Sequence, residues 1–428
     1  MRKHHTLRLI PALMTVAFSG AASASGFQLW EQTASGIGNA YAGSAAVAEN
    51  ASTIYFNPAG MTQLQSRQVS FGVTAVKTNF EFNNDGSRVG YLGTAGDGGN
   101  GGTWGAIPNA YLSWEVAKDW YLGLGLGAPF GLKTDYDTPW KGGAHSNSFE
   151  IKTININPSI AWRANDWLSL GAGFSWQKID VNYQKQTAVL SPVLAASKTK
   201  LEADDSAWNW NVGALFTVNP KTKIGMSYRS TTKYTLDGSL STSGPSALIN
   251  AATSSNAQAD LKLPDTFVLS IAHALTDQWE LLGDISWTGW SSVPYVDIIR
   301  TSGAQSGRVA QKLDTAFEDT WRFALGANYK VNDAWKIRMG IAYDQTPVPN
   351  AEHRLTSLPD NDRTWFSGGF QWKPNKTSAL DVGLAYVYVK DANINNGQAP
   401  SPTSPAGLIK GTYNDSAWIM GAQYSLSF

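Results

Sequence analysis

The sequence predicts an antiparallel transmembrane β-barrel of fourteen strands with an N-terminal plug. Three observations predict it: a secretory signal at the N-terminus, an alternation of large apolar residues with small or charged ones, and a regular series of short turns and long loops. We expect three segments, which are a signal peptide at 1–24, a hatch inside the lumen at 25–66 and the barrel at 67–428.

The N-terminus carries the parts of a secretory signal. Arg2, Lys3 and Arg8 are followed by an apolar stretch at 9–18 and by small residues at 22–24. The apolar stretch is shorter than the roughly 20 residues that a membrane-spanning helix needs, so it predicts export and cleavage. The mature chain contains no apolar run of that length either.

Composition excludes several classes of function. Removing the signal takes away three of the 33 basic residues and none of the 33 acidic ones, so the mature chain is mildly acidic and nucleic acid is not an expected partner. The chain has no cysteine, which suits an exported protein held together by strand pairing rather than by disulfides. Metal, nucleotide and phosphate motifs are absent, so we expect no cofactor.

A two-residue period runs along the chain. In the last strand the apolar residues fall on even positions: Trp418, Met420, Ala422, Tyr424, Leu426 and Phe428. The same period recurs at 122–127, 168–176, 321–326 and 335–344, where glycine, serine or basic residues occupy much of the other face. A soluble core of glycine and arginine would be hard to fill. The period therefore favours a barrel with its apolar face towards lipid and its small or charged face towards the lumen.

Short turns and long loops alternate between the predicted strands. Six short polar turns stand at 118–119, 165–166, 219–222, 277–278, 332–333 and 374–376. Seven longer stretches rich in Gly, Ser, Asn and Pro lie near 83–103, 131–147, 185–206, 237–259, 292–312, 346–362 and 391–411. Thirteen connections join fourteen strands, with the short turns on the periplasmic side. Trp120, Trp167, Trp279 and Trp335 each follow a short turn and are expected to form the inner aromatic girdle.

The composition of the segment at 25–66 does not predict a strand. It is rich in glycine and alanine and ends in Asn57-Pro58-Ala59-Gly60. Proline and glycine at this density argue against a barrel strand, whereas small residues permit close packing against a wall. We expect this segment to precede the barrel and to fill it.

Several segments resemble a known family. Residues 25–36 (SGFQLWEQTASG), residues 40–51 (AYAGSAAVAENA) and Asn57-Pro58-Ala59 are similar to the start of the FadL family of outer-membrane long-chain fatty-acid transporters. Segments at 129–136, 262–265, 287–292, 340–348 and 359–363 resemble the family too. The resemblance covers essentially the whole mature chain and implies a fourteen-stranded barrel with an N-terminal hatch.

The resemblance also implies a route for an amphipathic ligand. The ligand would land in an apolar groove between the third and fourth extracellular loops, enter a pocket above the hatch and leave sideways where the third strand is kinked. Carried over residue by residue, the gate and kink are Asn57, Pro58, Ala59, Phe130 and Gly131. Glycine in a strand marks a bulge or a close backbone approach. Packing against the plug is the other interpretation of Gly131, and Phe27 is expected to line the pocket.

Two loops carry apolar residues that are expected to form the groove. The candidates are Val189, Leu190, Val193 and Leu194 in the third loop, with Leu248 and Ile249 in the fourth. Apolar loop patches that face water are typical of binding surfaces, although the packing of a short helix on itself is an alternative.

Basic residues that meet a carboxylate in the family have imperfect counterparts here. The arginine after the fifth strand falls on Gln184, beside Lys185, and the lysine before the tenth strand falls on Leu313, beside Lys312. We take Lys312 as the candidate head-group partner, and a one-residue slip would turn its side chain to the other face.

The predicted function is passive uptake of long-chain fatty acids across the bacterial outer membrane, by a monomer in contact with outer-membrane lipid and lipopolysaccharide. Import of aromatic or alkane hydrocarbons is the alternative, because apolar burial of about 0.8 kcal/mol per methylene dominates binding. The hatch argues against an open general porin. Only His145, His273 and His353 remain after signal removal, without a recognisable orienting acid, so a lipid hydrolase or other enzyme is not expected.

Overall fold

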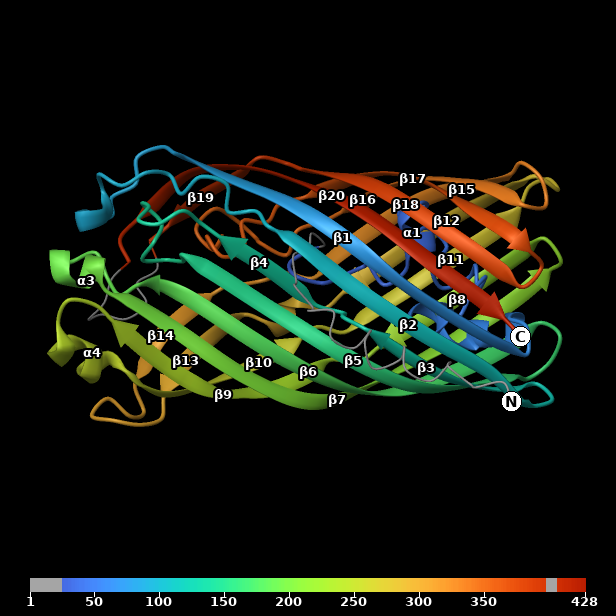
Figure 1. Ribbon diagram of the computed structural model, residues 1–428, viewed down its shortest axis with the longest axis horizontal. Coiled ribbons are helices and arrows are strands. Elements are labelled where there is room, and N and C mark those ends of the chain that lie inside the picture. The colour runs from blue at the N-terminus through green and yellow to red at the C-terminus, as the bar shows by residue number, and fades with distance from the viewer. Residues whose placement is uncertain (1–24, 398–405) are drawn as a thin grey trace, which may run out of the picture.

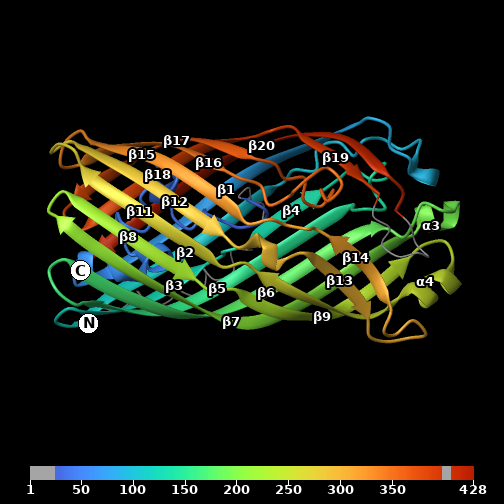
Figure 2. The same ribbon diagram turned by 180° about the vertical axis from the view of Figure 1, so that it is seen from behind.

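The computed structural model describes residues 25–397 and 406–428, and the predicted signal peptide at 1–24 lies outside these residues. Strands make up most of the described chain and join into one sheet that closes on itself (Figures 1 and 2). Within the described residues, no helix has the length and apolar character needed to cross a membrane.

The sheet is built from twenty strand segments. The first ten are β1 (Arg67–Asn84), β2 (Trp104–Ala117), β3 (Trp120–Gly127), β4 (Gly131–Asp135), β5 (Ser148–Arg163), β6 (Leu168–Gln186), β7 (Lys198–Asn219), β8 (Thr222–Arg229), β9 (Thr232–Ser243) and β10 (Ser255–Leu263). The others are β11 (Thr266–Ala274), β12 (Trp279–Thr288), β13 (Tyr295–Arg300), β14 (Val309–Asp314), β15 (Thr320–Lys330), β16 (Trp335–Asp344), β17 (Arg363–Asn375), β18 (Ser378–Val389), β19 (Ala392–Asn396) and β20 (Ile409–Ser427).

These segments make fourteen barrel strands, because six of the strands are each interrupted once. The interrupted strands are β3–β4, β8–β9, β10–β11, β12–β13, β14–β15 and β18–β19. The first and last strands pair antiparallel from Gln68–Ser427 to Asn84–Gly411 and close the barrel. The predicted fourteen-stranded antiparallel fold is therefore confirmed.

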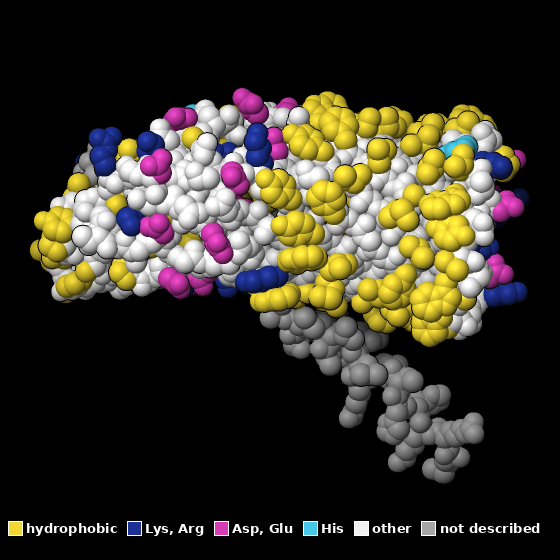
Figure 3. Space-filling view, turned by 90° about the horizontal axis from the view of Figure 1, so that it is seen from above, with side chains coloured by type: hydrophobic (Ala, Val, Ile, Leu, Met, Phe, Trp, Pro, Cys, Tyr) yellow, Lys and Arg dark blue, Asp and Glu magenta, His cyan; other side chains and the backbone are white. Residues whose placement is uncertain are grey.

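Side chains alternate between the outside and the lumen as the two-residue period predicts. On β3, Leu122 and Leu124 are exposed on the outer face, while Gly123, Gly125 and Gly127 contact the hatch or neighbouring inward side chains. Figure 3 shows that the outward apolar side chains gather over the half of the barrel that holds the short turns, whereas charged side chains occupy the other half. The apolar half has the character of a lipid-facing belt.

The connections follow the predicted asymmetry, although several extracellular loops are shorter than expected. Strands β13 and β14, for example, run through much of the stretch at 292–312 that was predicted as loop. Trp120 and Trp335 stand exposed beside their turns, and they stack on Trp162 and Trp372 of neighbouring strands. Aromatic pairs of this kind form the girdle at the turn end of the barrel.

The segment before β1 lies inside the barrel as a hatch. Its short helices are α1 (Ala34–Ile37), α2 (Thr53–Phe56) and the 3-10 helix η2 (Pro58–Gln63). The other helices lie in connections and are η3 (Gly90–Leu92), α3 (Pro192–Ala196), α4 (Ala247–Thr253) and η4 (Trp290–Ser292). Most hatch residues are buried, so the hatch provides the core that a lumen of this size would otherwise lack.

Ion pairs fasten the hatch to the wall. The guanidinium of Arg338 lies 2.7 Å from Glu49 of the hatch and 2.7 Å from Asp381 of β18. Lys336 adds a second contact to Glu49 at 3.0 Å. Because Arg338 is almost completely buried and both acids are charged partners, loss of any one of them would leave an unpaired charge inside the barrel.

Candidate ligand pocket and wall opening

An apolar cavity of about 720 Å³ lies in the lumen between the hatch and the extracellular loops, and we call it the upper cavity. Side chains of seven strand segments and of three segments between strands line it together with Phe27 of the hatch. The lining is Phe27, Phe149, Ile151, Val181, Tyr183, Leu201, Leu236, Ala259, Leu261, Val293, Val296, Ile298, Leu313, Thr315, Phe317, Leu355, Ser357 and Leu358. Its size and apolar walls suit a hydrophobic small molecule.

A second cavity of about 460 Å³ adjoins the upper cavity and contains two cations, so we call it the basic chamber. Tyr183, Leu201 and Ile298 line both spaces. Lys185 at the end of β6 and Arg300 at the end of β13 line the chamber and are 7% and 9% exposed.

The two cations lack acidic partners. Arg300 donates to the carbonyl oxygen of Thr253 at 2.5 Å and to the hydroxyl of Ser255 at 3.0 Å. Within the described residues, neither Arg300 nor Lys185 has a carboxylate within salt-bridge distance. Two neighbouring buried cations without a counter-ion favour the binding of an anionic group.

Lys312 does not reach these cavities with its ammonium group. The residue is exposed on the outer face of β14, and its ammonium lies 4.6 Å from the centre of the Tyr295 ring. The alternation of the strand turns Gln311 and Leu313 inward instead. The expectation for Lys312 is therefore corrected, since the one-residue difference places its side chain outside the barrel.

Four aromatic rings separate the upper cavity from the space below. Phe27 lies 5.9 Å from Phe130 and 4.9 Å from Trp290, measured between ring centres. Trp290 also contacts Phe317 at 5.8 Å and is completely buried. We call Phe27, Phe130, Trp290 and Phe317 the aromatic partition, and Phe27 brings the hatch into it.

The wall of the barrel is broken beside the partition. The third strand stops at Gly127 and resumes at Gly131, so residues 128–130 leave the sheet. The ladder with β2 ends at Ala110–Leu126, and the next pairing is the single bridge Gly102–Thr134. A stretch of β2 that includes Pro108 therefore has no partner on this side, and proline is tolerated where a strand forms an edge.

The hatch occupies the broken stretch. The amide of Leu29 donates to Pro129 at 2.8 Å, and the amide of Gly131 donates to Phe27 at 2.9 Å. The Gln32 side chain donates to the carbonyl of Ala128 at 2.6 Å. These bonds satisfy backbone groups that a continuous strand would pair, so the first hatch residues cover the opening.

Asn57, Pro58 and Ala59 lie elsewhere in the barrel. The Asn57 side chain donates to the carbonyls of Ala45 at 2.8 Å and Ala214 of β7 at 3.0 Å. Ala59 packs against Gly171 of β6. The structure thus places Phe130 and Gly131 at the break but does not bring the Asn-Pro-Ala segment to it, because the backbone of 57–59 packs on β6 and β7.

The predicted groove residues divide into two groups. Val189 is buried beside Val89, Leu92 and Ala406, so its prediction as an exposed residue is corrected. Leu190 and Leu248 are exposed, whereas Val193, Leu194 and Ile249 are half-buried. The helices α3 and α4 that carry most of them lie at the same end of the barrel (Figure 1). Helix α3 precedes β7 and α4 follows β9, and these two strands pair.

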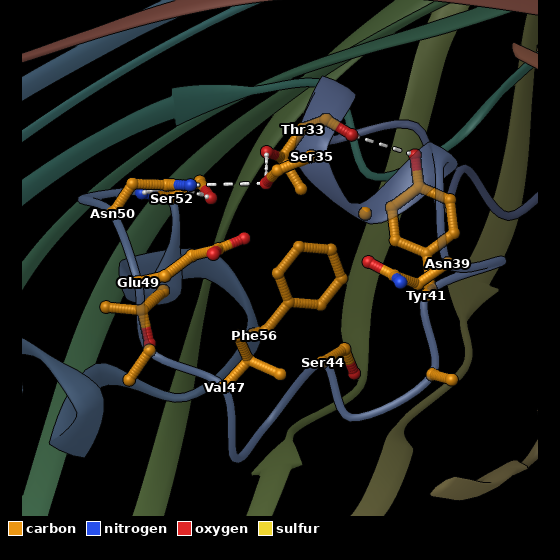
Figure 4. Close-up of a pocket in the computed structure, with 14 residues that line it drawn as sticks. Thr33, Ser35, Asn39, Tyr41, Ser44, Val47, Glu49, Asn50, Ser52 and Phe56 are labelled. Carbon is orange, nitrogen blue, oxygen red and sulfur yellow. Dashed lines mark hydrogen bonds between the residues drawn. The ribbon is translucent and has the colours of Figure 1, made fainter. Parts of the chain in front are cut away.

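The hatch contains a polar cavity of its own, of about 400 Å³ (Figure 4). Figure 4 shows Thr33, Ser35 and Asn50 joined by hydrogen bonds at one edge, with Phe56 pointing between them and Tyr41. Phe56 also lines a further cavity beneath the partition, so its ring lies between the two spaces.

A barrel with a hatch, an apolar lumenal cavity and a covered break in its wall defines a class of protein, the outer-membrane transporters of hydrophobic compounds. The comparison with known families agrees with this class. The chain belongs to the family of outer membrane protein transport proteins (OMPP1/FadL/TodX), whose model matches residues 15–428. It is a transport protein of the outer membrane and not an enzyme.

Similar proteins include transporters of two kinds of compound. The long-chain fatty acid transport protein of Escherichia coli O6:H1 is 27% identical over 448 residues, with 97% of each chain covered. The crystal structure of a Pseudomonas aeruginosa FadL homologue has a TM-score of 0.86 at 23% identity and covers 94% of this chain and 100% of that one. The P. putida toluene transporter TodX has a TM-score of 0.66 at 18% identity, with 89% and 94% covered.

Proposed function

We propose that this transporter takes up long-chain fatty acids, with the hydrocarbon chain in the upper cavity and the carboxylate in the basic chamber. The observation that carries the proposal is the pair Lys185 and Arg300. They line a cavity that shares Tyr183, Leu201 and Ile298 with the apolar one, and they have no acidic partner among the described residues. An uncharged hydrocarbon would give neither basic side chain an anionic partner.

The energetics divide between the two spaces. Each buried methylene contributes about 0.8 kcal/mol, so some ten of them contribute on the order of 8 kcal/mol before ordering costs. A buried hydrogen bond to a charged group contributes about 1.5–3 kcal/mol. The hydrocarbon chain of the ligand therefore supplies most of the affinity. Lys185 and Arg300 supply the preference for an acid over a hydrocarbon.

The proposed route continues past both cavities. The exposed residues Leu190 and Leu248 would collect the ligand from lipopolysaccharide at the cell surface. After the upper cavity, the ligand would pass the aromatic partition and leave through the break at residues 128–130, into the outer leaflet of the membrane. Residues 27–32 of the hatch would have to yield at that point, since they fill the break.

The head-group assignment is tested by comparing ligands of equal length. Purified Lys185→Gln and Arg300→Gln variants would be titrated with a sixteen-carbon fatty acid and with the matching alcohol. We expect each substitution to weaken binding of the acid by about tenfold, equivalent to about 1.4 kcal/mol, and to leave binding of the alcohol unchanged.

Lys312→Gln is the matched control, because its ammonium lies outside the barrel and its loss should change neither affinity. Equal losses for acid and alcohol would contradict a carboxylate site. If the wild-type protein instead bound toluene in preference to the acid, the ligand class would be an aromatic hydrocarbon.

A further inference from the structure

A half-buried arginine faces the cavity beneath the aromatic partition. Arg229 ends β8 on the inward face of the strand and lines a cavity of about 450 Å³, which we call the lower cavity. Tyr55 and Phe56 of the hatch, Phe130 of the partition and Thr266 of β11 line the same space. The lower cavity therefore lies between the partition, the hatch and the barrel wall.

The guanidinium of Arg229 is held from one side only. It lies over the Tyr55 ring at 4.6 Å, and Nη2 donates to the Tyr55 carbonyl oxygen at 2.9 Å. Its other terminal nitrogen, Nη1, is buried and has no hydrogen-bond partner among the described residues. In the described part of the chain no carboxylate lies within salt-bridge distance of Arg229.

Two buried arginines of the lumen differ from Arg229 in this respect, whereas Arg322 resembles it in having no carboxylate within salt-bridge distance among the described residues. Arg338 is paired with Glu49 and Asp381, and Arg363 is paired with Asp360. A buried charge without a counter-ion is costly, and a charged ligand that supplies the missing acceptors relieves that cost. A carboxylate fits the need, because a guanidinium presents its donors in a planar fork that matches two carboxylate oxygens.

The lower cavity also lies at the right point of the route. Phe130 belongs to the partition and lines the lower cavity, while Phe27 lines the upper cavity. A ligand that passes between these two rings leaves the upper cavity and meets Arg229. Phe130 is at the same time the last residue of the broken stretch of wall, so the lower cavity borders the opening.

We propose that Arg229 is a transit site for the carboxylate of a ligand that has left the basic chamber. Nη1 donates to one carboxylate oxygen, while the stacking on Tyr55 holds the guanidinium in place. The head group thus moves from Lys185 and Arg300 to a third basic side chain and is not left unpaired in an apolar lumen. This inference rests on the proposed uptake of fatty acids and assigns a second site to it.

The test separates transit from binding. Arg229→Gln would be compared with the wild-type protein for equilibrium binding of a sixteen-carbon fatty acid and for its uptake into cells or proteoliposomes. We expect unchanged affinity at the upper cavity, uptake of the acid lowered by about tenfold and unchanged uptake of the matching alcohol. Arg229→Lys keeps the charge and should restore part of the uptake of the acid.

Lys223→Gln is the matched control. Lys223 lies on the same strand and the same inward face, but it does not line the lower cavity. Its substitution should leave the uptake of the fatty acid and of the matching alcohol unchanged.

Two results would overturn the proposal. Equal losses of acid and alcohol uptake in Arg229→Gln, with a lower unfolding temperature, would mean that Arg229 only holds the hatch through Tyr55. Unchanged uptake of the acid would mean that the head group does not visit Arg229. A failure of the proposed function itself appears separately, as an absence of fatty-acid binding by the wild-type protein or as insensitivity to Lys185→Gln.

Discussion

At the level of single residues, the hatch fits the barrel because the wall lacks side chains where the two backbones meet. A Cβ added to Gly225 would collide with the carbonyl group of Ala45, and one added to Gly340 would collide with the backbone of Asn39. Extra atoms in a packed interior force side chains or backbone to shift, which costs about 1–3 kcal/mol. These glycines therefore determine how closely the hatch lies against the wall.

We expect Gly225→Ala to loosen the hatch. The substitution should lower stability by about 1–3 kcal/mol, measured as the midpoint of thermal unfolding in detergent, and should increase ion-conducting openings in planar bilayers. Gly368→Ala is the control, because the nearest atom to its added Cβ lies 4.0 Å away. If both variants lose stability alike, the loss comes from the altered strand and not from the contact with the hatch.

Whether a residue stands at an odd or an even position of its strand decides whether its side chain faces the lumen and can reach the ligand. Apolar residues on even positions of 168–176 face lipid, so the sequence alone could have assigned Lys185 to the lumen. Arg300 carried no such signal. It lies in a stretch that was predicted as loop, and the pairing of β13 with β14 shifts register beside it at Ile298 and Ile299. An irregularity of that kind depends on the partner strand.

Among the elements, the loop at 136–147 closes over the lumen and contains one titratable contact. His145 Nε2 lies 3.0 Å from the carbonyl oxygen of Gly407, and the His145 carbonyl oxygen accepts from Tyr183. Burial, together with the charge of Lys185, lowers the pKa of His145 to about 4. The imidazole is therefore neutral at pH 7 and can donate to Gly407.

We expect the docking of this loop to weaken in acid. The pKa in the folded protein lies below the ordinary value of 6.5, so the stabilising contribution is fully present above pH 6.5 and is lost as the pH falls through about 4. The protection factors of the amides across 136–147, which are exchange rates corrected for the intrinsic effect of pH, should fall between pH 7 and pH 4.5. His145→Gln keeps a donor but does not titrate, and it should remove this fall in protection. An undiminished fall would assign the effect to carboxyl groups.

The number of strands was predictable because turns are encoded locally. Asn or Asp at each tight turn, followed by tryptophan at four of the six turns, identifies the short connections without reference to the rest of the chain. The position of the Asn-Pro-Ala segment was not predictable in this way. Its contacts are with Ala214 and Gly171, which lie more than a hundred residues away in the sequence. The break in the third strand likewise depends on distant hatch residues that satisfy its backbone.

For the whole molecule, the hatch divides into a fixed part and a part that covers the opening. Glu49, Asn57 and their partners fasten the later residues to five or more strands through ion pairs, hydrogen bonds and backbone packing on glycine. The first residues, up to Gln32, bind at the break through Leu29 and Gln32, while Ser25, Gly26 and Gln28 hydrogen-bond to Asp344, Asp360 and Thr266. A lateral route requires only these first residues to move, whereas an axial route would require the fixed part to leave its place.

The absence of cysteine makes this division testable, because an engineered pair would form the only disulfide. Ala42→Cys with Gly326→Cys would pin the fixed part, since the two Cβ atoms would lie 3.0 Å apart, close to the roughly 3.5–4.5 Å of disulfides. Gln28→Cys with Phe130→Cys would pin the first part at an antiparallel bridge, where the Cα spacing of about 4.5–5.5 Å also suits a disulfide.

We expect the oxidised Ala42–Gly326 pair to take up fatty acid as fast as its reduced form, and the oxidised Gln28–Phe130 pair to take it up only after reduction. Each reduced protein serves as the control for its own substitutions. If the Ala42–Gly326 protein also took up fatty acid only after reduction, the fixed part of the hatch would have to move. The ligand would then cross the barrel along its axis into the periplasm.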